Sequence, residues 1–191
     1  MSTNPYESPT AYSTGYGTGA PDRPVAGIVF GILNLLFGTL GICGIAFSSV
    51  MFFIPLDPDM VRQNPALQLM QDNQFYKLFM QASVVVGGVF TFVLIGSGIG
   101  LLMMKSFGRT LALWYGWYGI ISTVLTAVVN VFIVFPALIN HMNNMPQGPA
   151  QAGAIGGIIG GVIGIVIAPI YPGLLLFFMY RPNIVAAYRG K

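Results

Sequence analysis

Residues that could carry out chemistry are rare in this chain. The segment NHMNNMPQGP, residues 140–149, contains His141, Met142 and Met145, whose imidazole and thioether groups suit soft copper ions. One imidazole and two thioethers make a thin donor set, so the preferred interpretation is a short polar turn whose methionines rest on the membrane surface. The pair Asp57 and Asp59 lacks the third ligand and the glycine of a calcium loop. We therefore predict no metal site in either segment.

Catalytic groups are missing from the long apolar stretches. No Asp, Glu, Lys or Arg occurs in residues 24–56, 78–104, 110–140 and 142–180. Hydrolysis within a membrane needs a nucleophile with its base, a carboxylate pair or a metal cluster, and ion coupling typically needs a titratable group in a span. No phosphate-binding, dinucleotide-binding or zinc-binding spacing occurs in the polar segments either. The sequence predicts neither an enzyme nor a cofactor-binding protein.

The composition is that of an integral membrane protein. The chain has 191 residues, of which 55% are hydrophobic and 7% are charged, whereas soluble domains carry about 25% charged residues. Each uncharged stretch exceeds the roughly 20 residues that cross a bilayer, and none alternates as a barrel strand does. We predict an all-α, polytopic four-helix transmembrane bundle with spans near 25–54, 78–104, 110–135 and 152–180.

The remaining segments are predicted to be tails and loops. Residues 1–24 are rich in Ser, Thr, Gly, Pro and Tyr and have few side chains to bury, which favours a disordered cytoplasmic tail. The bundle is expected over 25–182 and a second cytoplasmic tail over 183–191. Asn64 followed by Pro65 is typical of a helix start, so an interfacial helix is expected to lead into the second span.

The distribution of basic residues predicts the orientation in the membrane. The two tails and the 105–109 turn hold Arg23, Lys105, Arg109, Arg181, Arg189 and Lys191, whereas the other side holds Arg62 and Lys77. Because cytoplasmic loops carry the excess of Lys and Arg, both termini are expected to be cytoplasmic, in an inner membrane. Aromatic residues near these charges are expected to form an interfacial belt, namely Trp114, Tyr115, Trp117, Tyr118, Tyr180 and Tyr188. Lys105, Arg109 and Arg181 suit anionic lipid headgroups, and the net charge of +3 predicts no nucleic-acid surface.

Glycines one helical turn apart mark the last span. They form two adjoining ridges, the first made by Gly153, Gly157 and Gly161 and the second by Gly156, Gly160 and Gly164. The first and second spans add the pairs Gly27 with Gly31 and Gly96 with Gly100. In a bilayer, small residues let helix backbones approach closely. We expect these glycines to form contact faces within the bundle or between copies, and leucine at Gly157 and Gly161 to disrupt that packing.

Polar residues and prolines inside the spans predict further packing features. Pro169, Pro172 and Gly173 are expected to kink or break the last span. Asn34, Thr91 and Ser122 or Thr123 fall near mid-depth, and Gln81 and Asn130 share the outer leaflet, where such groups usually hydrogen-bond across helices. Asn34 is expected to contact a polar group on the second or third span. Cys43, the only cysteine, is expected to be a small apolar packing residue.

Two short motifs carry a resemblance to known proteins. The opening NPYESP, residues 4–9, resembles the N-P-Y-x-S-P signature of small four-span membrane proteins of planctomycete-type bacteria. The stretch GIGLLMMKSFGRTLALWYG, residues 98–116, is similar to a basic and aromatic turn of small bacterial four-span proteins, with Phe107 where tryptophan is common. The resemblance implies a four-helix inner-membrane protein without an assigned activity. It supplies no catalytic or ligand-binding residues.

These patterns predict a structural or accessory membrane protein that works through its helix interfaces. Its expected partners are the lipid bilayer and either further copies of itself or a larger membrane complex. The alternative is an oligomeric passive pore for a small solute, because Ser, Thr, Asn and backbone carbonyls can line one.

Overall fold

The computed structural model describes residues 24–53, 61, 64–144 and 149–189. In this part of the chain all regular structure is helical, and four helical segments are long and apolar enough to cross a membrane. They are Val25–Ser49, Gln74–Leu102, Ser106–Asn140 and Gly153–Met179. The prediction of an all-α, four-helix protein is therefore confirmed. The predicted N-terminal tail, the pair Asp57 and Asp59, and Met145 lie outside the described residues.

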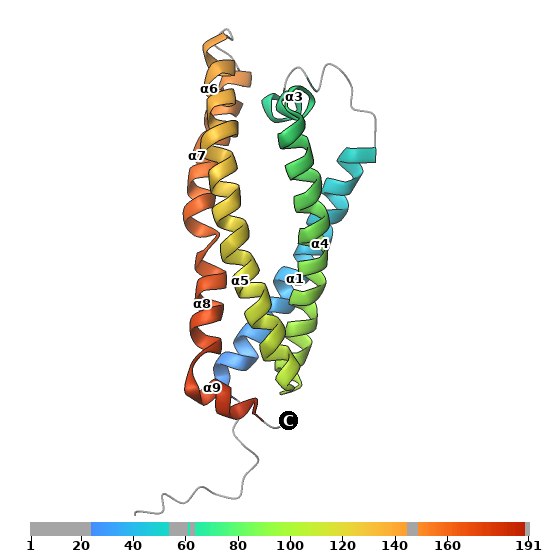
Figure 1. Cartoon of the computed structure of the whole chain (residues 1–191), viewed down its shortest axis with the longest axis vertical. Helices are drawn as coiled ribbons and strands as arrows, with labels where there is room; N and C mark the ends of the chain where they lie inside the picture. Colours follow the sequence, from blue (N-terminus) through green and yellow to red (C-terminus); the bar gives the residue numbers. More distant parts are fainter. Residues whose placement is uncertain (1–23, 54–60, 62–63, 145–148, 190–191) are drawn as a thin grey trace, which may run out of the picture.

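The helices form two pairs that meet at one end of the molecule (Figure 1). The first pair is α1 (Val25–Phe53) with α4 (Gln74–Leu102), and α3 (Pro65–Asp72) precedes α4. The second pair sets α5 (Ser106–Val129), η1 (Asn130–Val134) and α6 (Phe135–Asn144) beside α7 (Pro149–Ile167) and α8 (Ile170–Met179). The short helix α9 (Pro182–Ala187) lies near the α4–α5 connection, at what we call the terminal end. The opposite end, with α3 and α6, is the loop end.

The third span continues further than the sequence predicts. The sequence predicts a span that ends near residue 135, and Pro136 lacks an amide donor and has a ring that crowds the preceding turn of a helix. Instead, a π-helical turn over Asn130–Val134 precedes the proline, and the amide of Phe135 donates to the carbonyl of Asn130. The widened turn makes room for the proline ring, so the helix runs on to Asn144.

The fourth span is broken where its prolines predict. The α-helix α7 ends at Ile167, and α8 begins at Ile170, directly after Pro169. Pro172 is tolerated because it lies in the first turn of α8, where its missing amide hydrogen would have no intrahelical acceptor. The predicted kink or break is confirmed.

The helix expected before the second span is also present. α3 begins at Pro65, and the amide of Leu67 donates to the side-chain oxygen of Asn64 at 3.4 Å. Asn73 is the one residue between α3 and α4, and its side-chain oxygen accepts the amide of Tyr76 at 3.0 Å. This second cap starts the spanning helix without a longer loop.

A tight turn joins α4 to α5 at the terminal end. Met104 adopts a left-handed backbone conformation with φ of 57°. The amide of Met104 donates to the carbonyl of Leu101 at 3.2 Å. The amide of Lys105 donates to the carbonyl of Gly100 at 2.9 Å. This is the Schellman pattern, which usually places glycine at the left-handed position. Methionine replaces glycine here because its side chain is buried in the core, only 7% exposed.

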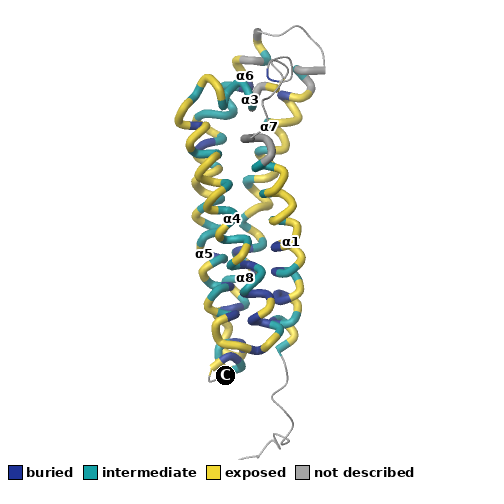
Figure 2. The backbone as a smooth tube through the Cα atoms, turned by 90° about the vertical axis from the view of Figure 1, so that its right-hand side faces the viewer, coloured by how far each residue is buried: buried dark blue, intermediate teal, exposed yellow. Residues whose placement is uncertain are grey.

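The buried core lies at the terminal end (Figure 2). It gathers side chains from each of the four spans and from α9, namely Phe30, Leu101, Met104, Ala112, Leu175, Met179, Ile184 and Tyr188. The hydroxyl of Tyr188 donates to the carbonyl of Leu101 at 2.9 Å, and burial raises the pKa of this phenol, so it stays protonated. The segment 183–191, described from the sequence only as a tail, thus contains a short helix that is part of the core.

Glycines bring three helices into backbone contact at this end. A Cβ atom added to Gly100 of α4 would lie 2.5 Å from Cα of Gly108 on α5. A Cβ atom added to Gly98 of α4 would lie 2.9 Å from the carbonyl oxygen of Gly31 on α1. Backbone approach of this kind requires glycine, since any side chain would push the helices apart.

Substitution of Gly100 tests this contact. Gly100→Ala should destabilise the protein by about 1–3 kcal/mol, because the added methyl group overpacks a backbone contact. Gly88→Ala in the same helix is the matched control, since a Cβ atom added there would have no atom within 4 Å. It should leave stability unchanged or raise it by up to about 1 kcal/mol. Unfolding followed by circular dichroism in detergent measures both. Equal stability of the two variants would contradict the contact.

Candidate functional site

A buried cluster of uncharged polar groups ties three spans together. Asn34 of α1 and Ser97 of α4 are both 0% exposed, and the amide nitrogen of Asn34 donates to the hydroxyl of Ser97 at 2.7 Å. Ser97 donates in turn to the carbonyl of Leu94 at 2.8 Å, and the hydroxyl of Tyr171 on α8 donates to the side-chain oxygen of Asn34. The predicted contact of Asn34 with the second span is therefore confirmed.

Tyr171 is the member of this cluster that sequence reasoning missed. The one sequence feature that could have indicated it is a single tyrosine within an otherwise apolar stretch, two residues after Pro169. The ring of Phe37 contacts it edge-on, with 4.7 Å between the ring centroids. The cluster contains no ionisable acid or base at ordinary pH and no activated nucleophile. The cluster can therefore act as a network of hydrogen bonds that holds the three helices together.

The other polar residues in the spans bond within their own helices. Thr91 donates to Gly87, Ser122 and Thr123 both donate to Gly119, and Asn130 donates to Thr126, in each case through a backbone carbonyl. This corrects the expectation of cross-helix bonds for Thr91, Ser122 and Asn130. Hydroxyl groups readily bond to the carbonyl three or four residues earlier, which removes the need for a partner on another helix. Gln81 is exposed on α4.

The glycines outside the last span contact neighbouring helices to different extents. Cβ atoms added to Gly27 and Gly31 would collide with Tyr188 and Leu102 respectively. One at Gly96 would lie at an ordinary 3.4 Å from Leu111. The pairs predicted in the first and second spans thus face other helices of the same chain. Their closest contacts are with Gly98 and Gly108, which the sequence analysis does not predict as packing residues.

The two glycine ridges of α7 have different surroundings. A Cβ atom at Gly161 would lie 3.0 Å from the ring of Phe135, and one at Gly157 would lie 3.7 Å from Leu138. This part of the helix faces η1 and α6. By contrast, nothing in the described chain lies within 4 Å of a Cβ atom at four glycines, which we call the open glycine face: Gly153, Gly156, Gly160 and Gly164.

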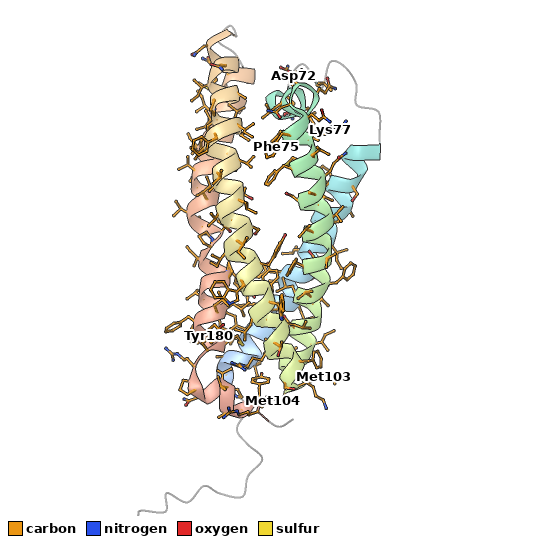
Figure 3. All side chains as sticks on the ribbon, in the orientation of Figure 1. Asp72, Phe75, Lys77, Met103, Met104 and Tyr180 are labelled. Atoms are coloured by element: carbon orange, nitrogen blue, oxygen red, sulfur yellow. The ribbon has the colours of Figure 1, made fainter. Side chains whose placement is uncertain are left out.

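Basic and aromatic residues gather at the terminal end, where Figure 3 places Met103, Met104 and Tyr180. Arg109 is half-buried, and its Nε donates to the carbonyl of Met179 at 3.0 Å, which caps the end of α8. Arg181 is exposed and lies over the rings of Phe177 and Phe178 at 4.9 and 5.0 Å. Lys105 is exposed. Lys105 and Arg181 are thus accessible to anionic headgroups, whereas Arg109 already has a protein partner.

The predicted aromatic belt is divided between the surface and the interior. Trp114 and Trp117 are 66% and 53% exposed. Tyr115 and Tyr118 are half-buried, and the ring of Tyr118 stacks on Phe90 of α4 with 3.7 Å between centroids. Of the predicted belt, Trp114, Trp117 and Tyr180 are therefore well exposed, whereas Tyr188 is buried in the core.

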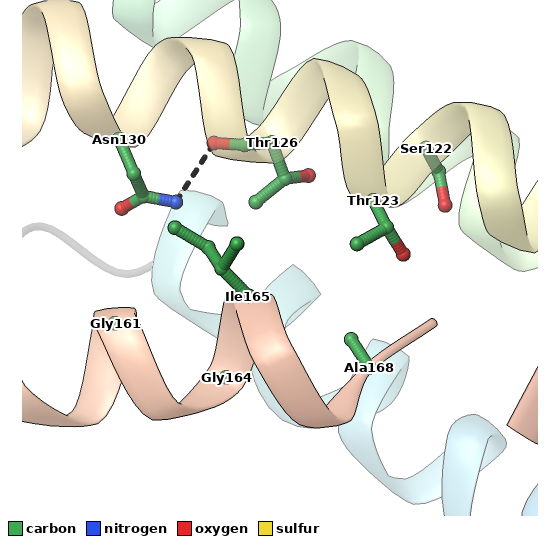
Figure 4. Close-up of a pocket in the computed structure, with 8 residues that line it drawn as sticks. All are labelled: Ser122, Thr123, Thr126, Asn130, Gly161, Gly164, Ile165 and Ala168. Carbon is green, nitrogen blue, oxygen red and sulfur yellow. Dashed lines mark hydrogen bonds between the residues drawn. The ribbon is translucent and has the colours of Figure 1, made fainter. Parts of the chain in front are cut away.

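A cavity of about 410 Å³, with polar side chains on one wall, lies between α5–η1 and α7 (Figure 4). It is lined by Ser122, Thr123, Thr126, Asn130, Gly161, Gly164, Ile165 and Ala168. A second cavity of about 340 Å³ shares Ser122, Thr123 and Ala168 with it and reaches Tyr171. A third, of about 230 Å³, lies between α4 and α5 and shares Ser122 and Thr126. The polar residues of α5 thus border three adjoining cavities rather than a neighbouring helix.

The described residues contain no group of three or more His, Cys, Asp or Glu side chains arranged to hold a metal ion. His141 and Met142 lie on helix α6 rather than in the predicted turn. Cys43 is exposed, which corrects the expectation that it packs inside the bundle. Comparison with protein-family models, curated proteins and solved structures finds no match for this chain.

Asn34→Leu tests the polar cluster. Leucine removes both cross-helix bonds and leaves the hydroxyl of Tyr171 unpaired, so the free energy of unfolding should fall by about 2 kcal/mol. The matched control is Thr39→Val, because Thr39 bonds to carbonyls of its own helix. It should change stability by less than about 0.5 kcal/mol. Equilibrium unfolding in mixed micelles measures both values. An unchanged free energy of unfolding for Asn34→Leu would contradict a stabilising role for the polar cluster.

Proposed function

We propose that the protein is a structural or accessory membrane protein whose activity is assembly, and that the open glycine face of α7 pairs with the same face of a second copy. One observation carries the proposal: at Gly153, Gly156, Gly160 and Gly164 no atom from elsewhere in the described chain, beyond the adjacent turns of the same helix, lies within 4 Å of a Cβ position. Glycine within a helix costs about 1 kcal/mol relative to alanine. Close packing against another helix offsets this cost.

The residues beside the open glycine face support helix pairing. Ile159 and Ile163 run along its edge and are 54% and 51% exposed. β-Branched side chains have few rotamers in a helix, so they lose little conformational entropy when another helix packs on them. Together they form a stiff ridge beside a smooth groove.

A second copy is the partner that fits this face best. The face has no charged or hydrogen-bonding side chain that would select a different protein. In a twofold-symmetric pair each groove receives the backbone of an identical groove, so the contact is self-complementary. From Gly153 to Gly164 the helix rises about 16 Å, roughly half the thickness of the hydrocarbon core. That is enough for a crossing between two helices.

The proposed setting is a bacterial inner membrane with both termini in the cytoplasm. The excess of basic residues in the tails and the 105–109 turn supports this orientation. The exposed Lys105 and Arg181 would then face the headgroups of the inner leaflet. The N-P-Y-x-S-P resemblance supports the bacterial origin.

A passive pore, the alternative, finds less support in the geometry. The polar cavities extend from Asn130 to Tyr171, whereas packed apolar side chains such as Leu101, Leu175 and Met179 fill the terminal end. A pore would therefore have to form between copies rather than through one chain. Conductance of reconstituted protein distinguishes the two functions.

The pairing is tested by Gly156→Leu combined with Gly160→Leu. These side chains would fill the groove from outside while leaving the intrachain contacts of Gly157 and Gly161 in place. The wild type should have the mass of a dimer in mild detergent, and the double variant that of a monomer with an unchanged helical spectrum. Light scattering coupled to size-exclusion chromatography measures the mass.

Gly88→Leu is the matched control for this experiment. A Cβ atom at Gly88 would also have no neighbour within 4 Å. The residues one helical turn before and after it are Val84 and Phe92, however, so their side chains prevent a groove from forming along this face. This variant should remain dimeric. A wild type that is monomeric, or a double variant that keeps the dimer mass, would contradict the pairing. A wild type that copurifies in fixed ratio with an unrelated protein would replace the second copy with that partner.

A further inference from the structure

The cavity between α5–η1 and α7 has two unlike walls (Figure 4). One wall is a polar stripe on the third span, formed by Ser122, Thr123, Thr126 and Asn130. The facing wall is formed by Gly161, Gly164, Ile165 and Ala168 of the fourth span, which are small or apolar. A guest in this cavity would therefore meet hydrogen-bonding groups on one side and a smooth apolar surface on the other.

The free hydrogen-bonding capacity of the polar stripe is mainly that of acceptors. Ser122 and Thr123 already give their hydroxyl hydrogens to the carbonyl of Gly119, at 3.1 and 2.7 Å. Asn130 gives an amide hydrogen to the carbonyl of Thr126 at 2.9 Å. The hydroxyl oxygens and the side-chain carbonyl of Asn130 keep lone pairs that can accept. The cavity thus favours a guest that donates hydrogen bonds.

The break in the fourth span adds to this acceptor character. In a continuous helix the carbonyls of Ile165 and Ala168 would accept from the residues four positions later. Those residues are Pro169 and Pro172, which have no amide hydrogen. Ile165 and Ala168 both line the cavity. The prolines therefore remove two donors from the helix beside a cavity with few free donors of its own, namely the hydroxyl of Thr126 and the second amide hydrogen of Asn130.

The guest must also be uncharged. None of the residues that line the three adjoining cavities is an Asp, Glu, Lys, Arg or His. An ammonium or phosphate group placed among them would lose its hydration without gaining a counter-ion, which is costly within a bilayer. A neutral hydroxyl donor meets no such penalty.

The route into the cavity favours a guest from the bilayer. Towards the loop end, the seam between α6 and α7 is closed by Phe135 against Gly161 and by Leu138 against Gly157. Towards the terminal end, the core closes the bundle. The cavity itself lies within the spanning segments Ser106–Asn140 and Gly153–Met179. A molecule dissolved in the hydrocarbon can enter sideways, provided that most of its body is apolar.

We infer that this cavity binds a neutral lipid-like molecule with an apolar chain and a hydroxyl head, the hydroxyl donating to the oxygens of the α5 stripe. The site shares Gly164 with the open glycine face, but its other lining residues lie outside that face and both of its walls belong to one chain, so the inference does not rest on the proposed pairing. It gives the hydroxyl residues of the third span a role that helix packing does not explain.

The experiment uses two photoreactive probes in nanodiscs containing the full chain. The first is hexadecanol with a diazirine in its chain, and the second is its methyl ether, which has the same chain and lacks the donor. Mass spectrometry of the crosslinked peptides locates the label. The alcohol should label residues 122–130 and 161–168 about fivefold more than the ether, as expected for one hydrogen bond.

Variants separate binding from general partitioning into the bilayer. Thr123→Val with Thr126→Val keeps the side-chain shapes but removes two oxygens from the polar stripe, so alcohol labelling should fall to the level of the ether. Thr39→Val, away from the cavity, should leave the preference for alcohol intact. Equal labelling of the wild type by both probes would overturn the inference, as would an alcohol preference that survives in the double variant. The Gly156→Leu and Gly160→Leu chain should keep the preference even if it is monomeric.

Discussion

The architecture depends on building a bundle without charges inside the membrane. Lipid tails are as apolar as the side chains of the spans, so burial alone holds the helices together weakly. This chain relies instead on uncharged hydrogen bonds and backbone contact, and both are concentrated towards the terminal end. Asn34 accepts from one helix and donates to another, so α1, α4 and α8 meet at a single side chain. The glycine contact between α4 and α5 then brings in the third span.

The surfaces on which the proposed functions rest lie where the helices of this bundle do not pack closely against one another. Towards the loop end the fourth span carries its open glycine face, and the third span lines a polar cavity. Two backbone irregularities adjoin this cavity, the π-helical turn that starts at Asn130 and the break before Pro169. π-Helical turns and broken helices often mark functional positions in membrane proteins. The terminal end is thus the tightly packed part of the bundle, while the other half of the spans carries the open surfaces on which the proposed pairing and binding rest.

Much of the fold could be predicted from the sequence, whereas the neighbours of each residue could not. Length and hydropathy are sufficient to predict four spans, and proline chemistry predicts the break before Pro169. Asn34 is expected to contact a polar group on another span because a buried amide needs a partner, but nothing in the pattern points to Tyr171. Glycine spacing shows which faces are smooth, yet not which helix lies opposite, so it does not single out Gly108. The third span is expected to end near residue 135, and the π-helical turn that lets the helix continue past Pro136 leaves no clear signal in the sequence.

Disulfide trapping in native membranes tests the central claim of symmetric pairing most directly. Ile167 lies two turns after Gly160 on the same face of α7 and is 57% exposed, whereas Val162 is 48% exposed and points away from that face. Each is replaced in turn by cysteine in a chain that also carries Cys43→Ser. Symmetric pairing predicts rapid formation of a covalent dimer through Ile167→Cys and little through Val162→Cys. Equal crosslinking at both positions, or none at either, would contradict it.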